Sequence, residues 1–101
     1  PSNNLSDIKV VPNPYVVWSG FEEYNYERIM RFTQLPEKCT ITVFTITGEK
    51  VIKLEHDNPL SGALEWNVRT VNNQEIAPGL YVFTVESPEG GKHIGKFAVI
   101  R

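Results

Sequence analysis

The feature of this chain that most constrains its fold is a series of short segments in which apolar residues recur at every second position. A β-strand places alternate side chains on opposite faces, whereas a helix spaces its apolar residues three and four apart. Gly, Pro and Asn separate the segments, as expected for turns. The pattern predicts seven strands, near Ile8–Val11, Arg28–Phe32, Cys39–Ile46, Lys50–Glu55, Leu64–Val68, Leu80–Ser87 and Ile94–Ile100.

Seven short strands in 101 residues predict an all-β fold, an immunoglobulin-like antiparallel β-sandwich of about seven strands with one hydrophobic core. Thr47-Gly48 and Pro88-Glu89-Gly90-Gly91 lie between strand segments, and glycine accepts the positive φ that hairpin turns need. We expect residues 7–101 to form the sandwich and the polar residues 1–6 to be a flexible lead-in from a preceding domain. The start at Pro1 rather than Met favours a fragment of a longer polypeptide.

In the segment from Cys39 to Val43, apolar residues alternate with threonine. Cys39, Ile41 and Val43 should therefore face the core, and Thr40 and Thr42 the solvent. Cys39 is the single cysteine, so an internal disulfide and a four-cysteine zinc site are both excluded. Its inward position favours a small buried apolar side chain over a nucleophile paired with a distant histidine.

Two aromatic residues are best explained by structural roles. Leu64 and Val68 flank Trp66 at period two, which places Trp66 in the core between the sheets. Tyr81 follows Pro78-Gly79 and resembles the corner tyrosine whose hydroxyl bonds back to the backbone.

The distribution of charged and apolar residues argues against nucleic acid as a partner and against a membrane-spanning helix. The net charge is −2, the pI is about 5.7, and the ten Lys and Arg residues are scattered, so there is no basic patch for nucleic-acid phosphates. No apolar run approaches the roughly 18 to 20 residues of a membrane-spanning helix. Pro1–Asp7 is polar and lacks the apolar core of a signal peptide.

No catalytic motif is present in the sequence. His56 stands in the polar segment His56-Asp57-Asn58-Pro59 and His93 follows Gly90-Gly91-Lys92, so both are expected to be solvated loop residues. There is no Gly-x-Ser-x-Gly motif, and Gly90-Gly91 lacks the residues of a phosphate-binding loop. We expect neither enzymatic activity nor a cofactor.

A group of acidic residues between positions 22 and 27 is a candidate for a Ca²⁺ site. Glu22, Glu23, Asn25 and Glu27, together with Asp57, could supply hard oxygen ligands. Their spacing matches no EF-hand loop, and a solvated acidic loop is the preferred interpretation. No metal is therefore predicted.

Aromatic residues are concentrated between Tyr15 and Tyr26, where Trp18, Phe21 and Tyr24 also occur. If exposed, they would stack on sugars or anchor a protein interface. Alternatively, they cover the open end of a small sandwich, and this second interpretation is preferred. The surrounding stretch, Val17 to Glu27, has no clear strand or helix pattern and is expected to be a long connection.

Six segments follow one another in an informative order: Val10-Val11-Pro12-Asn13-Pro14-Tyr15, Arg28–Phe32 with Leu35-Pro36, Ile41–Val51, Trp66, Ala77-Pro78-Gly79-Leu80-Tyr81-Val82-Phe83 and Gly95–Arg101. Taken together, they resemble the bacterial C-terminal Ig-like modules of the FlgD Ig-like and type IX secretion (Por) sorting-domain kind. The family often has Trp-Asp-Gly after its core tryptophan. Here Trp66-Asn67-Val68 replaces it, so a different loop is expected after Trp66.

The resemblance implies a non-catalytic C-terminal module of a larger secreted or cell-surface bacterial protein, which acts in sorting, secretion or attachment. Its implied partners are the upstream domains of the parent protein and a component of the secretion machinery or cell surface. Two other functions stay open: a carbohydrate-binding accessory domain of a secreted hydrolase, motivated by the aromatic segment, and a passive spacer.

Under the sorting hypothesis, the closing strand carries the information. Phe97 and Val99 fall on one face and Ile100 on the other, so the strand is either buried on both sides or presents an apolar side to a partner. It should pair with Leu80–Ser87 through Gly90-Gly91, and its other edge is then a possible recognition surface. The predicted partner-binding residues are Lys96, Phe97, Ala98, Val99, Ile100 and Arg101.

Overall fold

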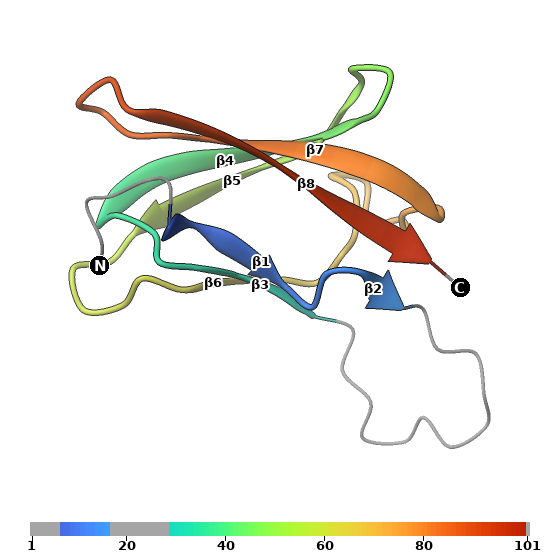
Figure 1. The fold of residues 1–101 in the computed structure, drawn as a ribbon, viewed down its shortest axis with the longest axis horizontal. Helices are drawn as coiled ribbons and strands as arrows, with labels where there is room; N and C mark the ends of the chain where they lie inside the picture. Colours follow the sequence, from blue (N-terminus) through green and yellow to red (C-terminus); the bar gives the residue numbers. More distant parts are fainter. Residues whose placement is uncertain (1–6, 17–28, 101) are drawn as a thin grey trace.

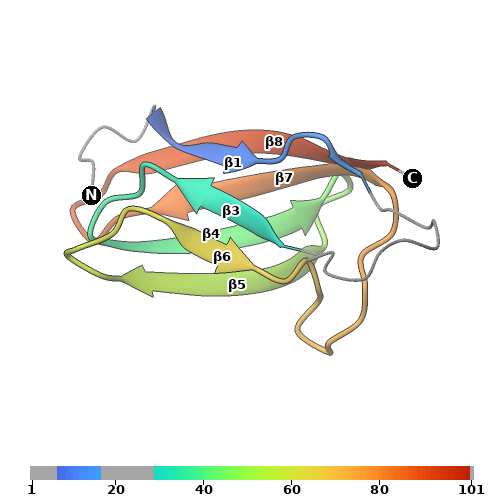
Figure 2. The same ribbon diagram turned by 90° about the horizontal axis from the view of Figure 1, so that it is seen from below.

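The computed structural model describes residues 7–16 and 29–100. In this part of the chain the strands are β1 (Lys9–Val11), β2 (Tyr15–Val16), β3 (Met30–Thr33), β4 (Lys38–Thr45), β5 (Lys50–Asp57), β6 (Leu64–Trp66), β7 (Gly79–Glu86) and β8 (Lys92–Ile100). They form a three-stranded sheet in the order β1-β3-β6 and a five-stranded sheet in the order β2-β8-β7-β4-β5. The two sheets lie face to face, as Figure 1 and Figure 2 show, which confirms the predicted all-β sandwich.

All seven predicted strands are present, with ends shifted by a few residues, and their pairings are antiparallel. An eighth strand, β2, was not predicted, because two residues after a pair of prolines carry no periodic pattern. It pairs with β8 in parallel, with Tyr15 opposite Val99 and Val16 opposite Ile100. The chain thus passes from the three-stranded sheet to the five-stranded sheet between β1 and β2 (Figure 1).

The core lies between the sheets and follows the predicted alternation along β4. Cys39, Ile41 and Val43 are buried, as predicted. Thr40 and Thr42 point to the outer face but are only partly exposed, because β5 and β7 flank β4 on both sides.

Aromatic rings join the two sheets. Phe32 from β3 meets Phe83 from β7 edge to face at 5.3 Å, and Trp66 from β6 meets Phe97 from β8 in the same manner at 6.1 Å. Tyr81 stacks on Phe97 at 5.5 Å. Because rings of both sheets interlock, the predicted core position of Trp66 is confirmed.

Two side-chain hydrogen bonds hold the loops around this core. The Trp66 indole N–H donates to the Arg69 carbonyl at 3.0 Å. The Tyr81 hydroxyl donates to the Ala77 carbonyl at 2.5 Å, as predicted for a corner tyrosine. After Trp66 the backbone still turns, because Val68 has a φ of 60°, in the left-handed region that favours glycine. Val68 thus takes a backbone conformation that favours glycine, the residue that the resembling family often has at this position.

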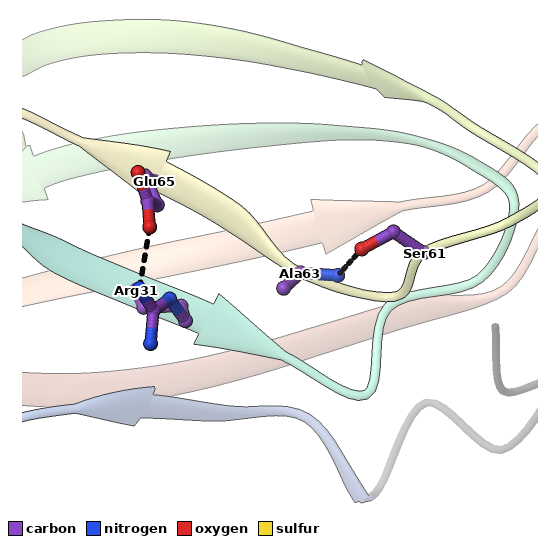
Figure 3. A network of polar contacts seen from close by, with 4 residues as sticks. All are labelled: Arg31, Ser61, Ala63 and Glu65. Carbon is purple, nitrogen blue, oxygen red and sulfur yellow. Dashed lines mark hydrogen bonds and ion pairs between the residues drawn. The ribbon is translucent and has the colours of Figure 1, made fainter.

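The outer face of the three-stranded sheet is polar. Arg31 of β3 and Glu65 of β6 lie opposite each other and form an ion pair (Figure 3). In the loop just before β6, the Ala63 amide donates to the Ser61 hydroxyl at 3.2 Å. Both charged side chains are about half exposed, so the pair contributes at most about 1 kcal/mol. Among the described residues, no helix is long and apolar enough to cross a membrane.

Candidate functional site

The closing strand, β8, contains most of the residues predicted to bind a partner. It pairs with β7 along its length through the hairpin at Gly90-Gly91, as predicted. Phe97 and Val99 are buried in the core, so they can support a contact but cannot make one directly. Lys96 and Ile100 are exposed, Ala98 is partly buried, and Arg101 lies outside the described residues.

The outer face of β8 continues into an apolar surface on its neighbours. Ile94 is 60% exposed, and Leu80, which lies opposite Ala98 on β7, is 56% exposed. On the other side, Val16 of β2 lies beside Ile100. Of the two arrangements considered for this strand, the structure therefore has the second, with an apolar side that faces outward.

The edge of β8 that faces away from β7 is covered in its carboxyl-terminal half by other parts of the same chain. β2 pairs with Val99 and Ile100. Just before β2, the Asn13 side-chain Nδ2 donates to the Lys96 backbone carbonyl at 3.2 Å, and the Ala98 backbone amide donates to the Asn13 side-chain oxygen Oδ1 at 3.2 Å. This carboxamide imitates a peptide group of a neighbouring strand. A partner that binds Lys96 to Ile100 must therefore contact their outward-facing side chains, because the backbone edge of this part of β8 is already paired.

Asn13 is the residue of this region whose role sequence reasoning missed. It stands between Pro12 and Pro14, in the Pro-Asn-Pro segment quoted for the family resemblance. Its two hydrogen bonds reach residues 83 and 85 positions away in the sequence. Local pattern analysis carries no signal for such a contact.

The prediction that His56 is a solvated loop residue is wrong. It lies in β5, is only 5% exposed, and sits opposite Cys39. Its Nδ1 is 3.0 Å from the Pro36 carbonyl and donates to it, whereas Nε2 is buried and has no partner among the described residues. The polar residues after His56 led to the prediction of a turn, although β5 extends to Asp57. His56 follows Ile52 and Leu54 at two-residue intervals, and both of these residues pack against the core. This spacing could have predicted that His56 faces inward.

His93 is also a strand residue rather than a loop residue. It lies in β8 and is partly buried, with its ring centroid 6.1 Å from that of Phe83. The two histidines are on different strands of the five-stranded sheet, β8 and β5, which are separated by β7 and β4. The fold does not bring them together as a catalytic pair.

Cys39 has the environment of a structural thiol. Burial raises its pKa to about 11, so the reactive thiolate is scarce at neutral pH. Among the described residues, no group of three or more His, Cys, Asp or Glu side chains could hold a metal ion. Of the residues considered for Ca²⁺, Asp57 is exposed at the end of β5, and Glu22, Glu23, Asn25 and Glu27 lie outside the described residues.

We expect Cys39 in the folded chain to react with a thiol reagent at pH 8 roughly a hundredfold more slowly than in urea, because reaction requires opening of the core. Stability should also fall as the pH rises from 9 to about 11, because the thiol of the unfolded chain ionises first. Burial raises the Tyr81 pKa as well and acts in the same direction. The midpoint of urea unfolding, measured across this pH range for the original chain and for Cys39→Ala, isolates the contribution of the thiol to the pH dependence. A reaction rate independent of urea would contradict a buried Cys39.

The structure describes one residue of the predicted aromatic segment. Tyr15 is buried in the core cluster, in agreement with a role in closing the sandwich. Trp18, Phe21, Tyr24 and Tyr26 lie outside the described residues. A sugar-binding platform on this segment stays a hypothesis.

Comparison with known proteins places this fold beside two solved structures. No protein-family model and no curated protein sequence matches the chain. PorZ, an essential bacterial surface component of the type-IX secretion system of Porphyromonas gingivalis, is similar over 96% of this chain, with a TM-score of 0.75 and 24% sequence identity. CopC from Methylosinus trichosporium OB3b is similar over 91% of this chain and 89% of its own, with a TM-score of 0.52 and 19% identity.

At these identities the two likenesses show a shared fold. The chain spans 12% of the PorZ chain, so the matching part of PorZ is one module of a much larger protein. CopC, by contrast, has nearly the same extent as this chain. The same sandwich therefore occurs both as a module and as most of a small protein.

Proposed function

We propose that this chain is a non-catalytic module of a larger secreted or cell-surface bacterial protein, and that it acts in secretion, sorting or surface attachment. The observation that carries the proposal is the likeness of nearly the whole chain to one small part of PorZ, a surface component of a secretion system. The proposed partners are the upstream domains of the parent protein and a component of the secretion machinery or cell surface.

The motifs that resemble those of sorting domains have structural roles in this fold. These roles support the proposal that the chain is a module of the sorting-domain kind. The Pro12-Asn13-Pro14 segment supplies the carboxamide that covers the edge of β8. The segment that begins at Pro78-Gly79 supplies Tyr81, whose hydroxyl ties down the preceding loop. Because both motifs organise the region around β8, we place recognition on the outward side chains of that strand.

A non-catalytic role is supported by the residues that could have supplied chemistry. Cys39 and His56 lie opposite each other, but both are buried. The raised pKa of Cys39 opposes formation of a thiolate nucleophile. His93 packs against a ring of the core. Cys39 and His56 line one surface pocket and His93 lines another, but the burial of Cys39 and His56 and the ring contact of His93 favour structural roles for these side chains.

The test is export of the full-length parent protein in its own host. We expect deletion of residues 7–101 to abolish surface display, and the pair Lys96→Glu and Arg101→Glu to reduce it strongly while the purified module keeps its melting temperature. A matched control changes Lys50 and Lys53, two exposed lysines on β5 at the far edge of the same sheet, to Glu. This control should be displayed normally.

Normal display of the deletion variant would overturn a role in secretion or attachment and leave the spacer hypothesis. If the deletion blocks display but the Lys96 and Arg101 pair has no effect, the module acts in export through other residues. In that case the assignment of charge recognition to β8 is wrong.

A further inference from the structure

Within residues 7–16 and 29–100, no strand pairs with the amino-terminal half of the outer edge of β8. β2 and the Asn13 side chain cover this edge from the Lys96 carbonyl to Ile100. Beside Lys92–Gly95, on the side away from β7, the described part of the chain places no strand, because β1 belongs to the other sheet. Figure 1 shows β8 extending well beyond β2 toward its amino-terminal end.

The backbone groups at this open edge are arranged to receive a strand. The contacts with Asn13 show that the Lys96 carbonyl and the Ala98 amide point away from β7. Alternate residues of a strand point their N–H and C=O to the same side. The Ile94 N–H and C=O, and the Lys96 N–H, therefore point to the open edge, where an added strand would bond to them.

A pocket of about 360 Å³ lies between this edge and β1. Ile8, Val10 and Phe83 give it an apolar lining, and Gly95 contributes backbone without a side chain. The Phe83 ring packs over Gly95, where a Cβ would lie 2.4 Å from its Cζ, so the ring and the Gly95 backbone line the pocket together. The pocket can therefore receive the inward side chains of a strand that pairs beside Gly95.

The charges around the open edge are positive. Lys92 and Lys96 are exposed on its outer side, and Lys9 and Lys96 line the pocket together with His93. The ion pairs of the described residues join Arg31 to Glu65 and Arg69 to Glu75, so they leave these lysines unneutralised. Glu86 lies opposite Lys92 on β7, and no described acidic side chain lines the pocket.

We propose that Lys92–Lys96 is a docking edge for an extended, acid-flanked segment of a partner protein, which adds to the sheet as a strand beside β8. The segment carries acidic residues opposite Lys92 and Lys96 and a β-branched residue opposite Ile94. The two positions between them carry small apolar side chains that enter the pocket.

A second copy of this chain is a poorer occupant. Antiparallel pairing of two β8 edges around Ile94 would place Lys92 of each copy opposite Lys96 of the other, and directly opposed like charges are destabilising. Unpaired lysines also protect an edge strand against such self-association. This inference does not depend on the proposed role in secretion, and binding of a peptide to the purified chain tests it separately.

The probe is a synthetic peptide with the core Glu-Val-Thr-Val-Glu and blocked ends, titrated into the full 101-residue chain. We expect the amide resonances of Lys92 to Lys96 to shift in NMR spectra, and those of β5 at the far edge to stay in place. A matched peptide with the core Lys-Val-Thr-Val-Lys should bind about tenfold more weakly or not at all, because it opposes lysine to lysine.

Two variants of the chain separate strand pairing from simple charge attraction. Ile94→Pro removes an N–H that points to the open edge and no bond to β7, so it should abolish binding, whereas the control Ile94→Thr keeps it. Changing Lys92 and Lys96 to Glu should weaken binding of the acidic peptide by about tenfold, and the variant should prefer the lysine peptide instead. This charge variant tests the proposal even if the proline variant does not fold.

Equal binding of both peptides, or binding retained by a folded Ile94→Pro variant, would overturn the proposal. Shifts confined to other strands would do the same. If ultracentrifugation finds a dimer that the acidic peptide does not dissociate, the edge belongs to a second copy, and the proposed partner segment is wrong.

Discussion

Alanine in place of Trp66 is expected to lower the free energy of unfolding by about 3 to 5 kcal/mol. The side chain is 2% exposed and packs edge to face against Phe97, so its removal opens a cavity between the two sheets. Its indole N–H also donates to the Arg69 carbonyl, which loses this partner. Against a total stability of about 5 to 15 kcal/mol for a domain, the variant would be marginally folded.

Urea unfolding followed by far-UV circular dichroism measures this loss. The control Trp66→Phe keeps an aromatic ring against Phe97 but lacks the N–H, and should lose much less stability, about 1 kcal/mol for the hydrogen bond plus a smaller cavity. A Trp66→Ala variant that loses less than the phenylalanine variant would contradict the position of Trp66 in the shared core.

The strands of this fold could be predicted because their signal is local. In β4 the alternation of Cys39, Ile41 and Val43 with threonines records which face is buried, and the structure has the same alternation. The hairpin before β8 was likewise marked by Gly90, whose φ of 94° suits glycine. Where a strand is long enough for period two to repeat, sequence alone gives both its existence and its inward face.

The errors arose where a long-range contact or a short element determines the structure. β2 spans two residues and exists because it pairs with the far end of the chain. His56 was assigned to a turn from its polar neighbours, although the pairing of β5 with β4 extends the strand to Asp57. Buried, it keeps one ring nitrogen bonded to Pro36, a contact that spans 20 residues.

The candidate site was predicted in part for the same reason. Alternation along the closing strand separated the buried Phe97 from the outward Lys96. The coverage of the strand edge could not be predicted, because it depends on a single carboxamide, Asn13, brought in from the other end of the chain. The remaining open edge, and hence the site that a partner strand could use, is a property of the tertiary structure.

Replacing Gly95 by valine is expected to cost about 3 kcal/mol of stability, at the upper end of overpacking penalties. A Cβ at this position would lie 2.4 Å from Cζ and 2.6 Å from Cε1 of Phe83. The ring cannot move away freely, because it is buried and packs against Phe32 at 5.3 Å. In an unobstructed strand, the better β-propensity of valine would instead give a gain of up to about 1 kcal/mol, so the sign of the effect is diagnostic.

A double-mutant cycle assigns the penalty to this ring. Phe83→Leu removes Cζ and Cε1, so the Gly95→Val change should cost little in that background, and the difference between the two backgrounds measures the clash. Ala98→Val, on the outer face of the same strand, is the control for added bulk and should change stability by no more than about 0.5 kcal/mol. If Gly95→Val stabilises the original chain, or costs the same with leucine at position 83, the Phe83 ring does not lie over Gly95.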